Sequence, residues 1–294
     1  MFPRRPANRG ARAAAIASAF LLVAALVTSA TAQRSGTTPG PAPTSGPDQA
    51  QLYKQCMDLA RTQPNLAFTQ AVQWRTRGGG LPAEHCEGLA LLNLRQYEEA
   101  AKRFHDVAAG STAAPLELRI EAYDNAAQAW MLANQPKNAK AEFDTALKLD
   151  PKNVDLLIGR GQASGLAGDY WAALDDLNAA LDIDSKRADA LVLRAASYRR
   201  VKAEDLAMDD VNRAIALDPE FPDAYVERGI LMAIKGDYDG AARDWKKVIE
   251  MAPDTFLSEQ AKRNLQELEK LKSKPPAAPS SPPSSSKKPP AKTK

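Results

Sequence analysis

Alanine recurs in this chain at a constant interval. The last four of Ala100, Ala139, Ala173, Ala207 and Ala241 are each 34 residues apart. Twelve residues before each alanine stands another glycine or alanine, at Gly88, Ala127, Gly161, Ala195 and Gly229. Four residues after each stands a large apolar residue, at Phe104, Phe143, Leu177, Val211 and Trp245. Prolines recur at the same interval or twice that interval, at Pro151, Pro219 and Pro253. A fixed period of this length indicates a stack of structural repeats, in which each unit buries its apolar face against its neighbours.

The spacing of small and large residues resembles that of the tetratricopeptide repeat family over nearly all of residues 81–255. In that family each unit is a pair of antiparallel helices, A and B. The small residue of helix A meets the alanine of helix B where the helices cross, so neither side chain can be bulky. The resemblance implies an all-α fold, a right-handed superhelical solenoid of antiparallel helix pairs. Its five units are expected at about 81–114, 120–153, 154–187, 188–221 and 222–255.

The chain departs from the family's pattern at a few positions. Ser185 replaces one closing proline. Lys202 stands where a glycine is usual at the end of helix A, as Gly168 and Gly236 do in their units. Five additional residues around Pro115 separate the first two units, and they predict a lengthened helix or a small kink there.

A solenoid needs a cap at each end, because a terminal unit has one uncovered face. Residues 256–272 are expected to form a C-terminal capping helix, with apolar residues at helical spacing on one face: Ala261, Leu265, Leu268 and Leu271. Residues 48–80 are expected to form a degenerate N-terminal helical hairpin that is broken at Pro64.

The two ends of the chain differ in composition from this repeat region. Residues 1–32 have the form of a secretory signal peptide, with four arginines before an apolar stretch at 13–27 and an A-x-A cleavage signal that ends at Ala32. An uncleaved membrane anchor is the alternative, since residues 13–32 are just long enough to span a bilayer. The Gly/Pro/Ser/Thr-rich linker 33–47 and the Pro/Ser/Lys tail 273–294 are both expected to be disordered.

The distribution of charge argues against nucleic-acid binding. The net charge of +3 conceals an acidic body, because all 36 acidic residues lie between Asp48 and Glu269 and residues 48–272 carry a net charge of −7. Nucleic-acid binding depends on a basic face, which this body does not offer. Catalysis is not expected either, since the chain has two histidines and no nucleophile elbow, phosphate loop or metal-ligand spacing. No cofactor is expected.

Cys56 and Cys86 are the two cysteines of the chain. Each is expected on the first helix of one of two consecutive helical hairpins, and such helices are neighbours in a tetratricopeptide stack. In an oxidising compartment this placement suggests a disulfide that attaches the N-terminal hairpin to the first repeat. Two alternatives are inert thiols and a metal or redox site that includes His85 or His105.

Arginine and aspartate recur in register in three units. Arg160, Arg194 and Arg228 each come one residue before the small residue of helix A, and Asp176, Asp210 and Asp244 each come three residues after the alanine of helix B. A row of arginines could bind an anionic ligand. We favour an Arg–Asp pair that joins helix A to helix B, because each arginine has its own carboxylate.

In tetratricopeptide proteins helix A lines the concave surface that holds a partner. The family's pattern places on this surface Glu121, Asp124 and Gln128 in the second unit; Asp155, Ile158 and Gln162 in the third; Asp189, Val192, Ala196 and Arg199 in the fourth; and Asp223, Val226, Ile230 and Ala233 in the fifth. One flank is acidic and the middle is apolar, which predicts a peptide with apolar anchors and some positive charge. The acids have an alternative role as favourable charges at helix N-termini.

These observations favour an exported, non-catalytic scaffold that binds a protein or peptide partner on the helix A surface. The expected location is periplasmic or secreted, after signal-peptide cleavage near Ala32. The alternative is a protein that binds an envelope polymer, such as peptidoglycan or an anionic glycan, through its basic tail and solenoid surface. The oligomeric state and the identity of the partner are left open by the sequence.

Overall fold

The computed structural model describes residues 48–110 and 114–273, and every regular element in these two ranges is a helix. The signal segment, the linker and the basic tail lie outside the described residues. The helices pair in chain order: α2 (Gln49–Thr62) with α3 (Pro64–Trp74), α4 (Gly80–Asn93) with α5 (Tyr97–Ala109), α6 (Leu116–Leu132) with α7 (Pro136–Leu149), α8 (Val154–Leu166) with α9 (Tyr170–Ile183), α10 (Ala188–Arg200) with α11 (Glu204–Leu217), and α12 (Pro222–Ile234) with α13 (Tyr238–Met251). The last helix is α14 (Phe256–Ser273).

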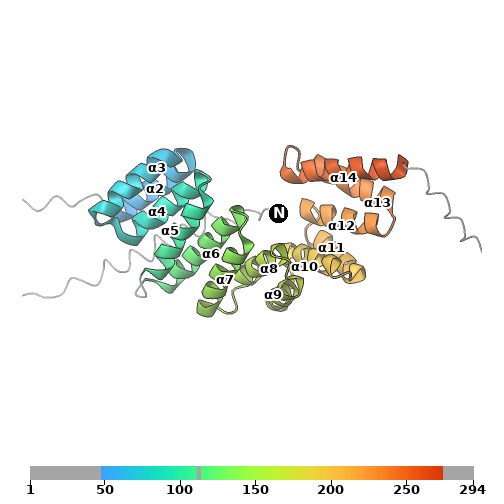
Figure 1. Cartoon of the computed structure of the whole chain (residues 1–294), viewed down its shortest axis with the longest axis horizontal. Coiled ribbons are helices and arrows are strands. Elements are labelled where there is room, and N and C mark those ends of the chain that lie inside the picture. The colour runs from blue at the N-terminus through green and yellow to red at the C-terminus, as the bar shows by residue number, and fades with distance from the viewer. Residues whose placement is uncertain (1–47, 111–113, 274–294) are drawn as a thin grey trace, which may run out of the picture.

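The helix pairs follow an arc, with α2 to α5 at one end and α12 to α14 at the other (Figure 1). Each helix packs mainly against its neighbours in the chain, as expected of a solenoid. In the middle of the arc α8 and α10 lie on the inner side and α9 on the outer side (Figure 1). The predicted all-α solenoid of antiparallel helix pairs is confirmed.

The 34-residue pattern is explained by the crossing of helices A and B. The five repeating alanines are completely buried. A Cβ atom added to Gly88 would lie 2.7 Å from the ring of Phe104, and one added to Gly161 would lie 2.9 Å from Cγ of Leu177. In each case the large side chain, sixteen residues later in the sequence, fills the space that the glycine leaves open. The small and large residues are therefore two halves of one contact.

Each helix A of the five repeat units ends at a residue with left-handed backbone conformation. The φ angles at Arg95, Asn134, Gly168, Lys202 and Gly236 are 62°, 58°, 88°, 61° and 84°. In the fourth unit Ala203 N donates to Tyr198 O at 2.9 Å and Lys202 N donates to Arg199 O at 3.1 Å, which satisfies two carbonyls of the last turn. Lys202 thus adopts the conformation that Gly168 adopts, although a side chain makes it less favourable.

The five additional residues near Pro115 lengthen one helix. Helix α6 has 17 residues, whereas α8, α10 and α12 have 13 each. Pro115 stands immediately before its first turn, where a missing N–H has no cost. The insertion therefore extends helix A of the second unit at its N-terminus.

The two ends of the array are covered by different means. At the N-terminus the hairpin of α2 and α3 packs against α4, and the chain passes from α3 to α4 through η1 (Arg75–Gly79), which is kinked at Gly78 with a φ of 90°. At the C-terminus Leu257, Ala261 and Leu268 of α14 are buried in one cluster with Trp245 and Val248. Leu271, expected on the same buried face, is 60% exposed. With 18 residues, α14 is longer than the 14-residue α13 against which it packs.

In the part of the chain that the structure describes, no helix combines the length and the apolar character needed to cross a bilayer.

Candidate partner-binding groove

The repeated arginines join three helices each. Arg194 in α10 donates two hydrogen bonds of 2.7 Å to the carboxylate of Asp210 in α11. Its remaining terminal nitrogen donates to Asn178 Oδ1 in α9 at 2.8 Å. Helix A of the fourth unit is therefore tied both to its own helix B and to the helix B before it.

The same geometry occurs in the third and fifth units. Arg160 donates to Asp176 at 3.0 and 2.6 Å, and Arg228 donates to Asp244 at 2.7 and 2.8 Å. The hydrogen bond to Asp176 raises the pKa of Arg160 above its ordinary value. Because all three arginines are bound to carboxylates of the chain itself, this row serves the packing of the solenoid and offers no free cation to an anionic ligand.

In the first two units other residues take the place of the repeated arginine–aspartate pair, which the sequence pattern did not reveal. In the first unit the charges are exchanged: Glu87 is on helix A, and Arg103, sixteen residues later, contacts it at 3.0 Å. In the second unit Ala126 takes the place of the arginine. Glu142 on helix B then hydrogen-bonds to Nδ1 of His105 on the preceding helix B, at 3.0 Å. An alignment of the five units on the small residue of helix A would have shown both the exchanged charges of the first unit and the missing arginine of the second.

The acidic flank of the expected groove is neutralised in its central part. Arg187, just before α10, donates to both oxygens of Asp189 at 3.0 and 2.7 Å and to Asp155 Oδ1 at 2.8 Å. Asp155 and Asp189 therefore bind a cation of the chain itself and link the third and fourth units. In α6, Gln128 donates to Asp124 at 3.0 Å. Glu121 is half-buried, and Asp223 in α12 is buried.

The apolar middle of the expected groove is part of the core. Ile158, Val192 and Val226 are only 2%, 1% and 1% exposed. Successive A helices touch directly, α8 with α10 and α10 with α12, and these side chains fill the space between them. The expectation that they form an accessible apolar surface does not hold in this structure. Ile230 and Ala233 are half-buried.

One part of the expected surface does form a hollow. Gln162 of α8 and Ala196 and Arg199 of α10 line a cavity of about 280 Å³. The other lining residues were not expected from the sequence: Gly161, Gly165 and Leu166 of α8, Tyr170 of α9, and Leu193, Ser197 and Arg200 of α10. They belong to the middle and the C-terminal turns of two neighbouring A helices and to the first turn of a helix B. Some of the lining residues occupy equivalent positions 34 residues apart, such as Leu166 and Arg200, and this relationship could have indicated them from the sequence.

The two arginines of the hollow differ in their surroundings. Arg199 donates to both carboxylate oxygens of Glu227 in α12, at 2.5 and 3.2 Å, and Glu227 is completely buried. The guanidinium of Arg200 lies over the ring of Tyr170, 4.9 Å from its centroid, and its side chain is exposed. Arg199 therefore belongs to an internal ion pair, whereas Arg200 faces the hollow and solvent.

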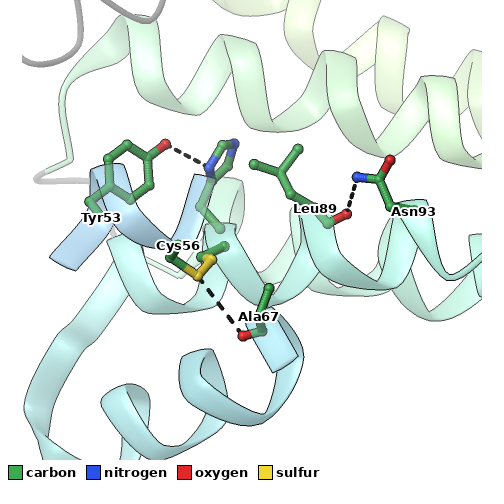
Figure 2. Close-up of a disulfide and its surroundings, with 7 residues drawn as sticks. Tyr53, Cys56, Ala67, Leu89 and Asn93 are labelled. Carbon is green, nitrogen blue, oxygen red and sulfur yellow. Dashed lines mark hydrogen bonds between the residues drawn. A yellow bond between two sulfur atoms is a disulfide. The ribbon is translucent and has the colours of Figure 1, made fainter. Parts of the chain in front are cut away.

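The N-terminal hairpin is attached to the first repeat by a disulfide between Cys56 in α2 and Cys86 in α4, whose Cα atoms are 6.1 Å apart (Figure 2). Beside it the hydroxyl of Tyr53 lies 2.8 Å from Nδ1 of His85 (Figure 2). On the other side of the ring, Nε2 of His85 lies 3.4 Å from the side-chain nitrogen of Asn125 in α6. His85 is completely enclosed, and its burial lowers its pKa to about 4. Among the residues that the structure describes, no three His, Cys, Asp or Glu side chains gather as a metal site would require.

Comparison with known proteins agrees with this geometry. Residues 120–153, which contain most of α6 and all of α7, match the tetratricopeptide repeat. The solved structure of TTC0263, a thermophilic TPR protein of Thermus thermophilus, superposes with a TM-score of 0.53 at 18% identity and covers 64% of this chain and 100% of its own. MamA gives a TM-score of 0.47 at 21% identity, with 60% of this chain and 96% of MamA covered. YrrB, described as a TPR protein with an unusual peptide-binding site, gives a TM-score of 0.44 at 22% identity, with 67% of this chain and 98% of YrrB covered.

Among curated proteins no sequence matches the chain. The matched repeat, the recurrence of its small–large contact in the neighbouring units and the superposition on a solved TPR protein lead to one conclusion: residues 120–153 are a tetratricopeptide repeat, and the described part of the chain has the fold of a tetratricopeptide solenoid.

Proposed function

We propose that this chain is an exported scaffold that holds a segment of a partner protein on the inner, helix A side of its solenoid, at the hollow between α8 and α10. The single observation that carries the proposal is that hollow. It brings Gln162, Ala196 and Arg199 together with accessible apolar side chains, while most of the rest of the expected surface is used for internal packing.

The contents of the hollow suit binding better than catalysis. Its lining contains amide, hydroxyl, guanidinium and apolar groups, and no histidine, cysteine or carboxylate that could act as a base or nucleophile. At about 280 Å³ it is smaller than the pockets that enclose drug-sized ligands or cofactors, so it suits one or two side chains of a peptide.

Export is the second part of the proposal. Residues 1–32 have the sequence of a signal peptide, and a buried disulfide is typical of proteins from oxidising compartments. In a Gram-negative host, the protein recovered from the periplasmic fraction should lack residues 1–32. Both cysteines should resist alkylation until a reductant is added. Full-length protein in the membrane fraction, or free thiols, would contradict this part.

The binding site is tested by site-specific photo-crosslinking. A photoreactive phenylalanine derivative replaces Leu166, which lines the hollow and is 45% exposed. The matched control replaces Leu217, which is 41% exposed at the far end of α11 and outside the hollow. Ultraviolet irradiation of living cells should attach a defined partner to the Leu166 variant and not to the Leu217 variant. Equal labelling by both variants would place binding elsewhere.

A second variant of the experiment addresses the envelope-polymer alternative. Deleting residues 273–294 removes the five lysines of the tail. A partner held at the hollow should still crosslink to position 166 after this deletion. Loss of the crosslink together with loss of sedimentation with peptidoglycan would favour the alternative.

A further inference from the structure

The charges around the hollow indicate the chemistry of the segment that it holds, and this inference rests on the proposed function. Of the ten residues that line the hollow, two are arginines and none is acidic. Arg199 is neutralised by the buried carboxylate of Glu227. Arg200 has no carboxylate partner among the residues that the structure describes, so the hollow has a net positive rim.

Arg200 is held in an orientation that favours a carboxylate ligand. Its guanidinium lies over the ring of Tyr170, 4.9 Å from the centroid, and this cation–π contact favours an orientation of the side chain beside the hollow. A planar guanidinium presented in this way binds a carboxylate through two parallel hydrogen bonds.

The carboxylates of the same two A helices do not oppose an acidic ligand. Asp155 and Asp189 are both bound to Arg187, which leaves this pair of carboxylates compensated within the chain. The positively charged partner predicted from the sequence depended on these acids being free. The ion pairs with Arg187 remove that reason for two of the four acids on the flank, the two that lie on the helices of the hollow.

The remainder of the lining is suited to an apolar side chain. Leu166 is 45% exposed, and Leu193 and Tyr170 are half-buried on neighbouring helices. Gly161 and Gly165, which have no side chains, are also part of the lining. An aliphatic or aromatic side chain can therefore enter while an adjacent carboxylate reaches Arg200.

We infer that the hollow binds a segment of a partner protein in which a large apolar side chain stands within two residues of an aspartate or glutamate. The carboxylate binds Arg200 at the rim, and the apolar side chain contacts Leu166, Tyr170 and Leu193.

The inference is tested with a random dodecapeptide library displayed on phage and selected on the immobilised full-length chain. We expect enrichment of peptides with an acidic residue next to a leucine, phenylalanine or tryptophan. A synthetic peptide of the enriched sequence should bind to the Arg200→Glu variant at least tenfold more weakly than to the parent chain. The Arg200→Lys variant should lose less affinity, because it keeps the positive charge. The matched control, Lys137→Glu, changes an exposed cation on α7 outside the hollow and should bind like the parent chain. Circular dichroism melting should change only slightly for all three variants, since both positions are exposed and Arg200→Glu loses only the contact with Tyr170 and a favourable charge at the end of α10.

Two results overturn the inference in distinguishable ways. Enrichment of basic or uncharged peptides whose binding is indifferent to Arg200→Glu would show that the chain binds peptides of another chemistry, and the proposed function would stand. No enrichment above bare resin would remove both the inference and the proposed peptide-binding function.

Discussion

Arg194 donates two hydrogen bonds of 2.7 Å to Asp210, and both side chains lie largely out of solvent where α10 crosses α11. The same pair recurs 34 residues earlier and later. The strength of one interaction can therefore be measured in three equivalent settings within a single molecule.

Replacing Asp210 by alanine should destabilise the fold by about 2–3 kcal/mol. The change leaves the Arg194 guanidinium mostly buried without its carboxylate, and removing one member of a buried pair costs more than the pair itself contributes. Urea unfolding followed by circular dichroism measures the difference. The matched control is Asp205→Ala, because Asp205 is 94% exposed in its pair with Lys235 and should contribute much less than Asp210 does. Equal effects of the two substitutions would contradict the prediction.

Acidification should weaken the N-terminal part of the solenoid through His85. Its pKa is lowered from 6.5 to about 4 by burial, so the folded state binds fewer protons than the unfolded state between these values. The free energy of unfolding therefore falls as the pH drops from 6.5 toward 4, by about 2 kcal/mol between pH 7 and pH 5. Urea unfolding at the two pH values measures this loss.

The control for this pH effect is His85→Gln, which removes the titrating group from the same buried position. Its stability should be lower at pH 7, since the contact with Tyr53 changes, but it should depend much less on pH. An identical pH dependence in the parent chain and the variant would assign the loss to other groups.

Loss of the disulfide should release α2 before the rest of the fold. The bond closes a loop of 30 residues, and its removal should lower the stability of the hairpin by about 3–4 kcal/mol. The core around it consists mainly of alanines, Ala60, Ala67, Ala71 and Ala90, which bury little surface each. Hydrogen exchange of a Cys56→Ala/Cys86→Ala variant should be faster in α2 and unchanged in α12. Uniform acceleration along the chain would contradict a local role.

Replacing Lys202 by glycine should stabilise the protein by about 0.5–1 kcal/mol. Lys202 has a φ of 61°, which is unfavourable for a residue with a side chain, and its own helix end is otherwise the same as that at Gly168. The reciprocal substitution, Gly168→Ala, should destabilise by a similar amount, since nothing lies within 4 Å of an added Cβ there and only the backbone conformation is affected. The two melting temperatures should move in opposite directions.

The contacts within one repeat followed from the spacing of residues along the chain. Gly161 had to be small because Leu177 lies against it, and Arg160 had to meet Asp176, since helix geometry and a short turn fix residues sixteen apart. The end of helix A at Gly168 is a local property of the same kind. These features recur in the pattern, so a single sequence was enough to predict them.

The surface that a partner meets depended on contacts between repeats. Nothing in the 34-residue spacing indicates how closely one helix A approaches the next, and this approach buries Val192 and Val226. It also brings Arg187 to Asp155, Arg199 to Glu227 and Arg200 onto Tyr170. The sequence by itself determined the repeat, its helix pairs and their internal contacts. Only the tertiary structure decided which charges are paired and which remain at the hollow, because the rotation between successive helix pairs arises from the packing of the whole array.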